Sequence, residues 1–362
     1  MSFELAGACP ALLIGLEQAT GGRPSGLATQ VGFTQSLMDP TNTAGVQIIR
    51  EAGGQDGNPK KVRVVYAQRA TPNQVTDTKD CDKGVSSPRL EEDYSINMAS
   101  HYKYGMTEAE VRRLCTAFEQ YRTLPVNTRN VNGQPRADIA VMGEIAEKFY
   151  RDIDVMRVSI NQNLLAAYAL QVGDWIGGGD SKTFTFIKSE DHALRLKGFN
   201  EMRQQIELTG FAGRPILFGH GNLDFAMMSA EYGCCNDAGQ DFGRMRQGAP
   251  FQFYKDIHTA AALGDENSFG ILIPGMAQFM SYNEYVGEFA RPIGTKYRGT
   301  IPDPSIPGLV YDFSIMPDEC DEMYTVQVSA YYDLFVAPRD MFKIGDRLAG
   351  VNGTFNAIAN AA

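Results

Sequence analysis

The sequence predicts an α+β protein built around one very long helix, and three observations lead to this fold class. Residues 138–172 contain no proline and a single glycine, and their apolar residues recur at helical spacing. Short segments in which apolar and polar residues alternate, as in half-buried strands, lie on both sides of that stretch. The chain has 362 residues, of which 43% are hydrophobic, so we expect two or three packed units.

The first 45 residues have little periodic apolar pattern. Turn-forming residues gather at positions 21–26 and again at 39–43. Such a stretch does not bury enough apolar surface to fold alone. We therefore expect an extended N-terminal arm that becomes ordered against neighbouring molecules.

A β hairpin is expected next. Residues 46–51 and 61–71 flank a turn rich in Gly, Asp, Asn and Pro, and in the second strand Val62, Val64 and Tyr66 occupy one face. Residues 72–93 carry many charges and read as a loop, followed by a strand over 94–104.

A helix is predicted to begin at Thr107 and to run to about residue 121. Thr107 and Glu110 have the spacing of a capping box, in which each side chain satisfies a backbone N–H of the first turn. The helix must end before Pro125, because a proline disfavours the α conformation of the residue ahead of it.

The long helix over residues 138–172 is the most distinctive predicted element. At 1.5 Å per residue it would extend roughly 50 Å, whereas helices of globular proteins average about 11–12 residues. Its predicted packing face consists of Ile145, Phe149, Ile153, Met156, Ile160 and Leu164. The opposite, polar side is predicted to carry Glu147, Arg151, Asp154, Arg157 and Gln162.

We favour a lever-like helix that lies across a sheet over two alternatives. A core helix of a large α/β enzyme is one, and a coiled-coil arm is the other. A coiled coil requires a heptad repeat sustained over several heptads. Here the apolar pattern runs for only a few turns, in one place.

The rest of the chain alternates short strands and short helices. We expect strands over 183–188, 215–218, 269–273, 309–315 and 324–335, helices over 191–207, 222–232 and 254–263, an irregular proline-rich connection over 294–307, and a small polar tail over 341–362.

The charge distribution argues against strong nucleic-acid binding. The net charge is −10, and all of it lies in residues 136–362, which hold 19 basic and 29 acidic side chains, while residues 1–135 hold 14 of each. Proteins that grip DNA through counterion release need a basic patch, and we find none. If this protein encloses DNA, it does so by geometry.

No catalytic or cofactor-binding constellation is found. The chain lacks GxxxxGK[ST] and GxGxxG motifs, and Asp241-Phe242-Gly243 has no HRD-type catalytic loop to accompany it. His220 follows a predicted strand, where a general base could lie, but no nucleophile elbow precedes it. We interpret it as a loop histidine and predict no catalytic residues and no cofactor.

No metal site is predicted either. The six cysteines form no CxxC pair, and we interpret them as reduced thiols. Cys234 and Cys235 are adjacent but have no second ligand pair nearby. The acidic run from Asp318 to Glu322 reads as a solvated turn between two late strands, with cation binding as the open alternative.

Several segments resemble the major capsid proteins of tailed bacteriophages, which have the Hong Kong 97-type fold. They are Gly221-Asn222 through Asp241-Phe242-Gly243, then Phe251–Asp256, Phe269–Gly275 and Leu309–Val336. The resemblance covers roughly residues 136–340, and its patterns have no strict spacing rule.

The resemblance implies a division of the chain into named regions. They are an N-terminal arm (1–45), an E-loop within an extended N-terminal region (46–135), the spine helix and peripheral domain (136–214), an axial domain (215–308), strands that return to the peripheral domain (309–340) and a C-terminal tail (341–362).

The resemblance also implies a structural role without enzymatic activity. Such a protein assembles with itself, as hexamers and pentamers, into the icosahedral head shell that encloses the double-stranded DNA genome without sequence-specific binding. A separate scaffolding protein, a portal and a possible decoration protein are the implied partners, and no membrane is involved. The implied location is the head shell of the virion, after assembly in the host cytoplasm.

Three other readings stay open. They are an encapsulin-like nanocompartment shell of the same fold, another virion protein such as a tail or baseplate component, and an α/β enzyme that acts on a small molecule through His220 or the carboxylates of 318–322.

Overall fold

The computed structural model describes residues 30–43, 46–50, 61–67, 89–123, 137–187, 197–211, 213–232, 251–284, 291–293, 296–303, 305–317, 323–339 and 350–361. These residues fold into two compact units. Unit 1 comprises Asn97–Ile160 and Ser281–Tyr332, and unit 2 comprises Gln30–Ile96, Asn161–Met280 and Asp333–Ala362. Helices and sheets occur in both units, so the predicted α+β class is confirmed.

The long helix is present and unbroken. Helix α4 spans Ala137–Gln171, which is 35 residues, and it contributes to both units. It ends where the chain turns at Gly173, whose backbone N–H donates to the carbonyl oxygen of Thr354 at 3.1 Å. A side chain at Gly173 would bring its Cβ to 2.2 Å from the Asn352 side-chain oxygen, so only glycine fits this turn.

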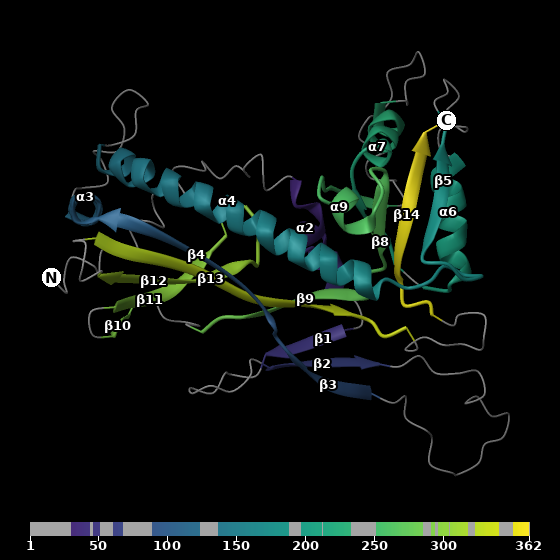
Figure 1. Cartoon of the computed structure of the whole chain (residues 1–362), viewed down its shortest axis with the longest axis horizontal. Helices are drawn as coiled ribbons and strands as arrows, with labels where there is room; N and C mark the ends of the chain where they lie inside the picture. Colours follow the sequence, from purple (N-terminus) through teal and green to yellow (C-terminus); the bar gives the residue numbers. More distant parts are fainter. Residues whose placement is uncertain are drawn as a thin grey trace, which may run out of the picture. The chain divides into compact units, whose positions relative to one another are not determined.

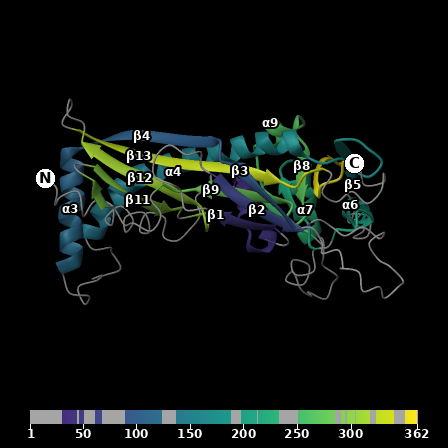
Figure 2. The same cartoon turned by 90° about the horizontal axis from the view of Figure 1, so that it is seen from below.

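A six-stranded sheet, most of whose residues belong to unit 1, has the order β10-β11-β12-β13-β4, with β9 also paired to β13. The pairs along that order are all antiparallel. The first part of α4 lies along this sheet, whose strands run side by side (Figures 1 and 2). The strands are β4 (Met98–Thr107), β9 (Ala277–Tyr282), β10 (Arg291–Ile293), β11 (Lys296–Pro302), β12 (Val310–Pro317) and β13 (Met323–Val336).

Helix α3 (Glu108–Thr123) follows β4 directly and begins with the predicted capping box. The Glu110 backbone N–H donates to Thr107 Oγ1 at 3.3 Å, and the Thr107 N–H donates to Glu110 Oε2 at 3.1 Å. The predicted start of this helix is confirmed because the two side chains satisfy backbone donors reciprocally.

Unit 2 contains a five-stranded mixed sheet of order β5-β14-β8-β6-β7. The pairs β14–β5 and β6–β7 are parallel, whereas β14–β8 and β6–β8 are antiparallel. Helix α6 lies beside β5 (Figure 1). The elements are β5 (Ser181–Phe186), α6 (Lys197–Leu208), β6 (Ile216–Gly219), α7 (Asn222–Tyr232), β7 (Gln252–Lys255), α9 (Thr259–Leu263), β8 (Ser268–Leu272) and β14 (Thr354–Ala361).

The predicted hairpin is also found in unit 2, but with a third strand. Strands β1 (Val46–Arg50) and β2 (Lys61–Ala67) pair antiparallel, and β3 (Arg89–Ser95) pairs with the other edge of β2. The prediction of a loop over 72–93 is therefore wrong at its end. One of the charges there, Asp93, faces Arg63 of β2, whose Nε lies 3.0 Å from Asp93 Oδ1.

The prediction of a polar C-terminal tail is wrong for residues 354–361. Strand β14 lies between β5 and β8, and Phe355, Ala357 and Ala359 are fully buried. Three of its eight residues are alanines, and such small side chains carried little hydrophobic signal in the sequence. Their alternation with polar residues is nevertheless that of a strand.

Two further sequence predictions are corrected. The proline-rich stretch 294–307 was expected to be irregular, yet β11 occupies part of it, with Pro302 as its last residue, where the missing N–H is tolerated. The helix expected over 254–263 begins only at Thr259, because residues 252–255 pair with β6 as β7. Strand β9 was not predicted at all.

The expectation of an extended arm is wrong for residues 30–43. Here α2 (Gly32–Leu37) and a 3-10 helix (Pro40–Thr43) pack into unit 2, and Val31 and Phe33 are fully buried. The close approach depends on Gly32, since a Cβ there would lie 2.5 Å from the Lys255 carbonyl oxygen. The earlier part of the predicted arm lies outside the described residues.

Candidate functional site

The six residues of the predicted packing face lie on α4, and each is 3% exposed or less: Ile145, Phe149, Ile153, Met156, Ile160 and Leu164. In unit 1 the ring of Phe149 packs edge-on against Phe313 of β12, with ring centroids 5.6 Å apart. It also lies 6.3 Å from the ring of Tyr104 on β4. The helix is thus held by aromatic contacts to two different strands of one sheet.

Two residues predicted on the polar side of α4 are in fact buried. Arg157 is 0% exposed and Asp154 is 7% exposed. The helical phase explains this, because Arg157 follows Ile153 by four residues and precedes Ile160 by three, which places all three on one face. Arg157 and Asp154 were assigned to the polar side because they are charged, although the helical spacing places them toward the core.

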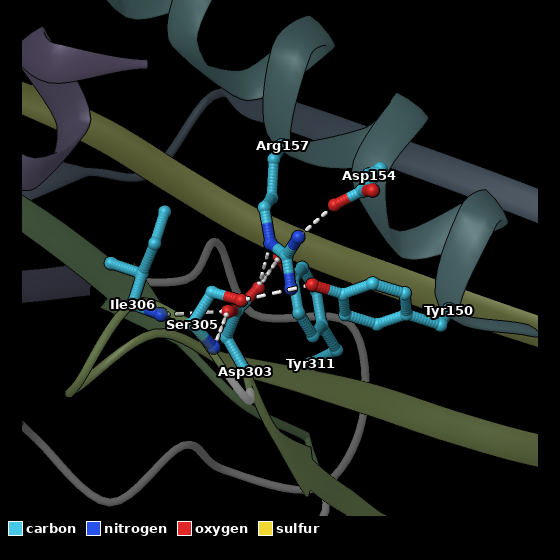
Figure 3. A network of polar contacts seen from close by, with 7 residues as sticks. All are labelled: Tyr150, Asp154, Arg157, Asp303, Ser305, Ile306 and Tyr311. Atoms are coloured by element: carbon cyan, nitrogen blue, oxygen red, sulfur yellow. Dashed lines mark hydrogen bonds and ion pairs between the residues drawn. The ribbon is translucent and has the colours of Figure 1, made fainter. Parts of the chain in front are cut away.

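Arg157 is the centre of a buried polar cluster in unit 1, which we call the arginine cluster (Figure 3). Its Nε donates to Asp303 Oδ2 at 2.6 Å, and its Nη1 donates to Asp154. Tyr311 donates its hydroxyl to the same Asp303 oxygen at 2.7 Å. The guanidinium carbon also lies 5.1 Å from the centroid of the Tyr150 ring, within cation–π range.

The second oxygen of Asp303 organises the segment between β11 and β12. Asp303 Oδ1 accepts the backbone N–H groups of Ser305 and Ile306 at 2.7 and 2.8 Å. One carboxylate therefore ties this segment to the long helix through Arg157 and to β12 through Tyr311, as Figure 3 shows. Sequence reasoning missed Asp303, because 146 residues separate it from Arg157.

The charge states in the arginine cluster follow from these contacts. Burial alone would lower the pKa of the Arg157 guanidinium, but the hydrogen bond and charge of Asp303 raise it, and the net shift is upward. Burial and the Asp303 charge raise the pKa of the Tyr311 hydroxyl well above its usual value. Arg157 therefore stays a cation, and Tyr311 stays a neutral hydrogen-bond donor.

A second buried polar cluster lies in unit 2. Asp256 Oδ2 accepts the Phe33 backbone N–H and the Asn161 side-chain amide, each at 2.8 Å. Its other oxygen accepts the His258 N–H at 2.8 Å. Asn161 in turn accepts the Thr34 N–H at 3.0 Å and the Thr34 hydroxyl at 2.8 Å. Residues 33–34 are thereby bonded to α4 and to the end of β7.

Asp256 is fully buried, and its pKa reflects two opposed causes. Burial raises the pKa of the Asp256 carboxyl, while hydrogen bonds from Phe33, Asn161 and His258 lower it. The net shift is upward, because desolvation is the larger effect. The donors compensate only in part for removing the carboxylate from water.

The histidine considered as a base lies beside an aspartate among the residues that the structure describes. His220 Nδ1 lies 3.9 Å from Asp224 Oδ2, and that same oxygen already contacts Lys255 Nζ at 2.8 Å. His101 contacts the Ser329 hydroxyl and His258 contacts the Gln162 amide.

The described ranges contain no group of three or more His, Cys, Asp or Glu residues that could hold a metal ion. Of the residues weighed for metal or kinase chemistry, Cys234, Cys235, the triplet 241–243 and the acidic run 318–322 lie outside the described residues. Predictions about them stay predictions. Within the part of the chain that the structure describes, no helix has the length and apolarity needed to cross a membrane.

Comparisons with known proteins give structural similarity only. No protein-family model matches the chain. No curated protein matches it in sequence. Similar solved structures include the Cyanophage A-1(L) capsid asymmetric unit (11% identity, TM-score 0.49, 90% of this chain and 92% of that chain), the capsid of Ralstonia phage GP4 (10%, 0.41, 84% and 85%) and a virus-like particle from Pyrococcus furiosus (9%, 0.39, 96% and 96%).

The order of elements in the chain agrees with the Hong Kong 97-type fold that the resemblance implies. The hairpin β1–β2 precedes the spine helix α4, the strands of the five-stranded sheet follow, and β12 and β13 return to pair in the sheet that contains β4.

Proposed function

We propose that this chain is a major capsid protein whose copies assemble into an icosahedral head shell around phage double-stranded DNA. One observation carries the proposal. The first part of an unbroken 35-residue helix lies along an antiparallel sheet whose strands come from before it (β4) and from long after it (β12 and β13). A shell subunit contacts several identical neighbours at once. A long helix fixed to a sheet suits this role, because it keeps the subunit rigid under those contacts.

The buried contacts of α4 suit this role. Its apolar face and the arginine cluster fix the helix to the sheet of unit 1 both by packing and by directional bonds. Apolar packing alone tolerates small shifts, whereas a buried arginine with two carboxylate partners does not. We infer that the cluster sets one position of the helix on the sheet in every copy.

Exposed apolar residues on α7 agree with self-association. Phe225 and Met228 lie one turn apart, and each is 48% exposed. Paired large apolar side chains on one helix face are typical of surfaces that are covered in an assembly. In the proposed shell, the cover is a neighbouring copy of the same chain.

The acidic balance of the chain agrees with enclosure of DNA rather than adhesion to it. The net charge is −10, and the excess lies entirely in residues 136–362. Binding by counterion release would need clustered cations. We propose that the genome is retained because the shell is closed, with no sequence-specific contact.

The proposal includes the partners and location that the resemblance implies. Copies would form hexamers and pentamers, assisted by a separate scaffolding protein and joined by a portal and a possible decoration protein. The role would be structural rather than enzymatic, in the virion head shell after assembly in the host cytoplasm.

Sedimentation velocity and negative-stain electron microscopy of the expressed chain, alone and with its scaffold, test the proposal. Closed regular particles are the expected result, and DNA in native particles would separate a phage head from a nanocompartment. Tubes or fibres would indicate a tail or baseplate component instead. A monomer under every assembly condition would overturn the proposal, and a monomer that turns over a small molecule would favour the enzyme.

A further inference from the structure

Residues 31–34, near the start of the described chain, are held in unit 2 by a set of hydrogen bonds. Val31 forms an isolated antiparallel β bridge with Asp256. The next residues, Phe33 and Thr34, donate to the Asp256 carboxylate and to the Asn161 amide oxygen at 2.8–3.0 Å. Asn161 completes the set by donating to Asp256 at 2.8 Å.

The same residues are removed from water. Phe33, Asn161 and Asp256 are fully buried, and Thr34 is 1% exposed. The Phe33 ring packs against the rings of Phe218 and Tyr168, at centroid distances of 4.6 and 5.1 Å. Apolar packing thus already holds this segment, and a buried carboxylate adds a desolvation cost that hydrophobic residues would not incur.

Apolar packing is often compatible with several arrangements of a segment. Buried polar groups that are fully hydrogen-bonded select one of them. Here the bonds define the register of the segment to a single residue. A slip by one position would move the Phe33 N–H away from Asp256 and would also move Gly32 from the place where only glycine fits beside the Lys255 carbonyl. Packing of Phe33 alone defines no such register.

We propose that Asp256 and Asn161 are positioning residues that fix the point at which the N-terminal arm leaves the subunit. We call this pair, with Phe33 and Thr34, the arm latch. The inference rests on the proposed function, because in a shell of identical subunits the arm that the resemblance implies would have to start from the same point in every copy. The arm then starts at the same position in every subunit.

A second anchor lies at the other end of the same segment and keeps it in place when the latch is broken. Asn42 donates to the Ala277 carbonyl at 2.9 Å and accepts the Gly275 N–H at 3.0 Å. A variant of the latch is therefore expected to free residues 31–36 while unit 2 stays folded.

The test substitutes Asp256→Asn in the full chain. Both oxygens of the Asp256 carboxylate accept N–H groups, from Phe33, Asn161 and His258. In the asparagine variant an NH₂ group replaces one of these oxygens, and since NH₂ cannot accept, at least one hydrogen bond is lost. By hydrogen–deuterium exchange we expect at least a roughly tenfold faster exchange of amides 31–36, with unchanged protection in β8 and β14. By electron microscopy we expect particles of mixed size in place of uniform ones.

A matched control separates positioning from loss of stability. Ile206→Ala opens a cavity in α6 of the same unit, away from the latch, and we expect it to lower the melting temperature while particles stay uniform. If Asp256→Asn is insoluble, Thr34→Val is used instead, since it removes only the hydroxyl bond to Asn161.

The outcomes decide two questions separately. Unchanged exchange of residues 31–36, uniform particles from the latch variant, or equally mixed particles from Ile206→Ala would overturn the latch. If the wild-type chain forms no particles, the proposed function fails, while the exchange data still report whether Asp256 holds the segment.

Discussion

Arg157 illustrates how a single residue fixes a long helix. It is fully buried, it bonds to carboxylates from its own helix and from the β11–β12 segment, and its charge is retained. Such a pair adds little net stability compared with hydrophobic residues of the same volume, because desolvation offsets attraction. Removing one partner is a different matter, since the other charge is then left buried and unpaired.

Substitution of Arg157 by methionine should therefore lower the free energy of unfolding by about 3–5 kcal/mol. Arg151→Met is the control, because Arg151 pairs with Glu147 on the exposed side of the same helix, and it should cost less than about 1 kcal/mol. Urea denaturation followed by circular dichroism measures both. Equal, small losses would mean that the arginine cluster does not hold the helix.

Asp256 predicts a pH dependence of stability with a definite sign. Its pKa in the folded protein is raised above the usual value of 3.8, so the folded state binds the proton more tightly than the unfolded state. The stabilisation is fully present below about 3.8 and is lost as the pH rises through the folded pKa. The unfolding free energy of wild type minus that of Asp256→Asn should therefore fall as the pH rises above about 3.8. A difference that rises with pH would contradict this assignment.

Residue-scale prediction from sequence succeeded where the information was local. The capping box of Thr107 and Glu110 involves residues three apart, and it was found. The position of Arg157 was also implied by helical spacing but was masked by its charge. Asp303 and Asp256 were not identifiable, because their partners on α4 lie 146 and 95 residues away.

At the scale of elements, α4 is stabilised along one face only. Ile160 is fully buried, whereas Leu170 near the end of the same helix is 85% exposed. We expect Ile160→Ala to lower the free energy of unfolding by about 2–5 kcal/mol and Leu170→Ala to change it by about 0.5 kcal/mol or less. Thermal and chemical denaturation measure the pair, and a larger effect at Leu170 would show that the face has been wrongly assigned.

Strand β14 gives the element-scale test of a corrected prediction. It bonds to β5 in parallel and to β8 in antiparallel fashion, so its removal separates two strands of one sheet. A chain that stops after residue 353 should fail to yield soluble protein with a cooperative transition. Deletion of Ala362 alone is the control and should leave the transition unchanged. A soluble, cooperative truncated chain would restore the reading of this segment as a tail.

Helices α4 and α7 were predicted more closely than strands β7, β9 and β14, for a physical reason. The period of α4 and the bounds of α7 follow from residues within each helix, and they were close to those found. Strands β7, β9 and β14 depend on partners distant in sequence, so composition alone did not reveal them.

At the scale of the whole molecule, a closed shell requires that copies of one chain meet in equivalent ways. Closed shells arise when contacts between unlike surfaces of identical subunits are repeated by rotation until they close. Each subunit must then hold its long helix and the exit of its arm in the same position. The arginine cluster and the arm latch are the two buried devices that we propose for these tasks.

A cryo-electron-microscopy reconstruction of particles assembled from the purified chain shows whether its copies form a closed shell. We expect closed particles with icosahedral symmetry, in which each subunit shows residues 137–171 as one unbroken helix. Particles without closed symmetry, or subunits in which that helix is divided into short helices, would contradict this expectation.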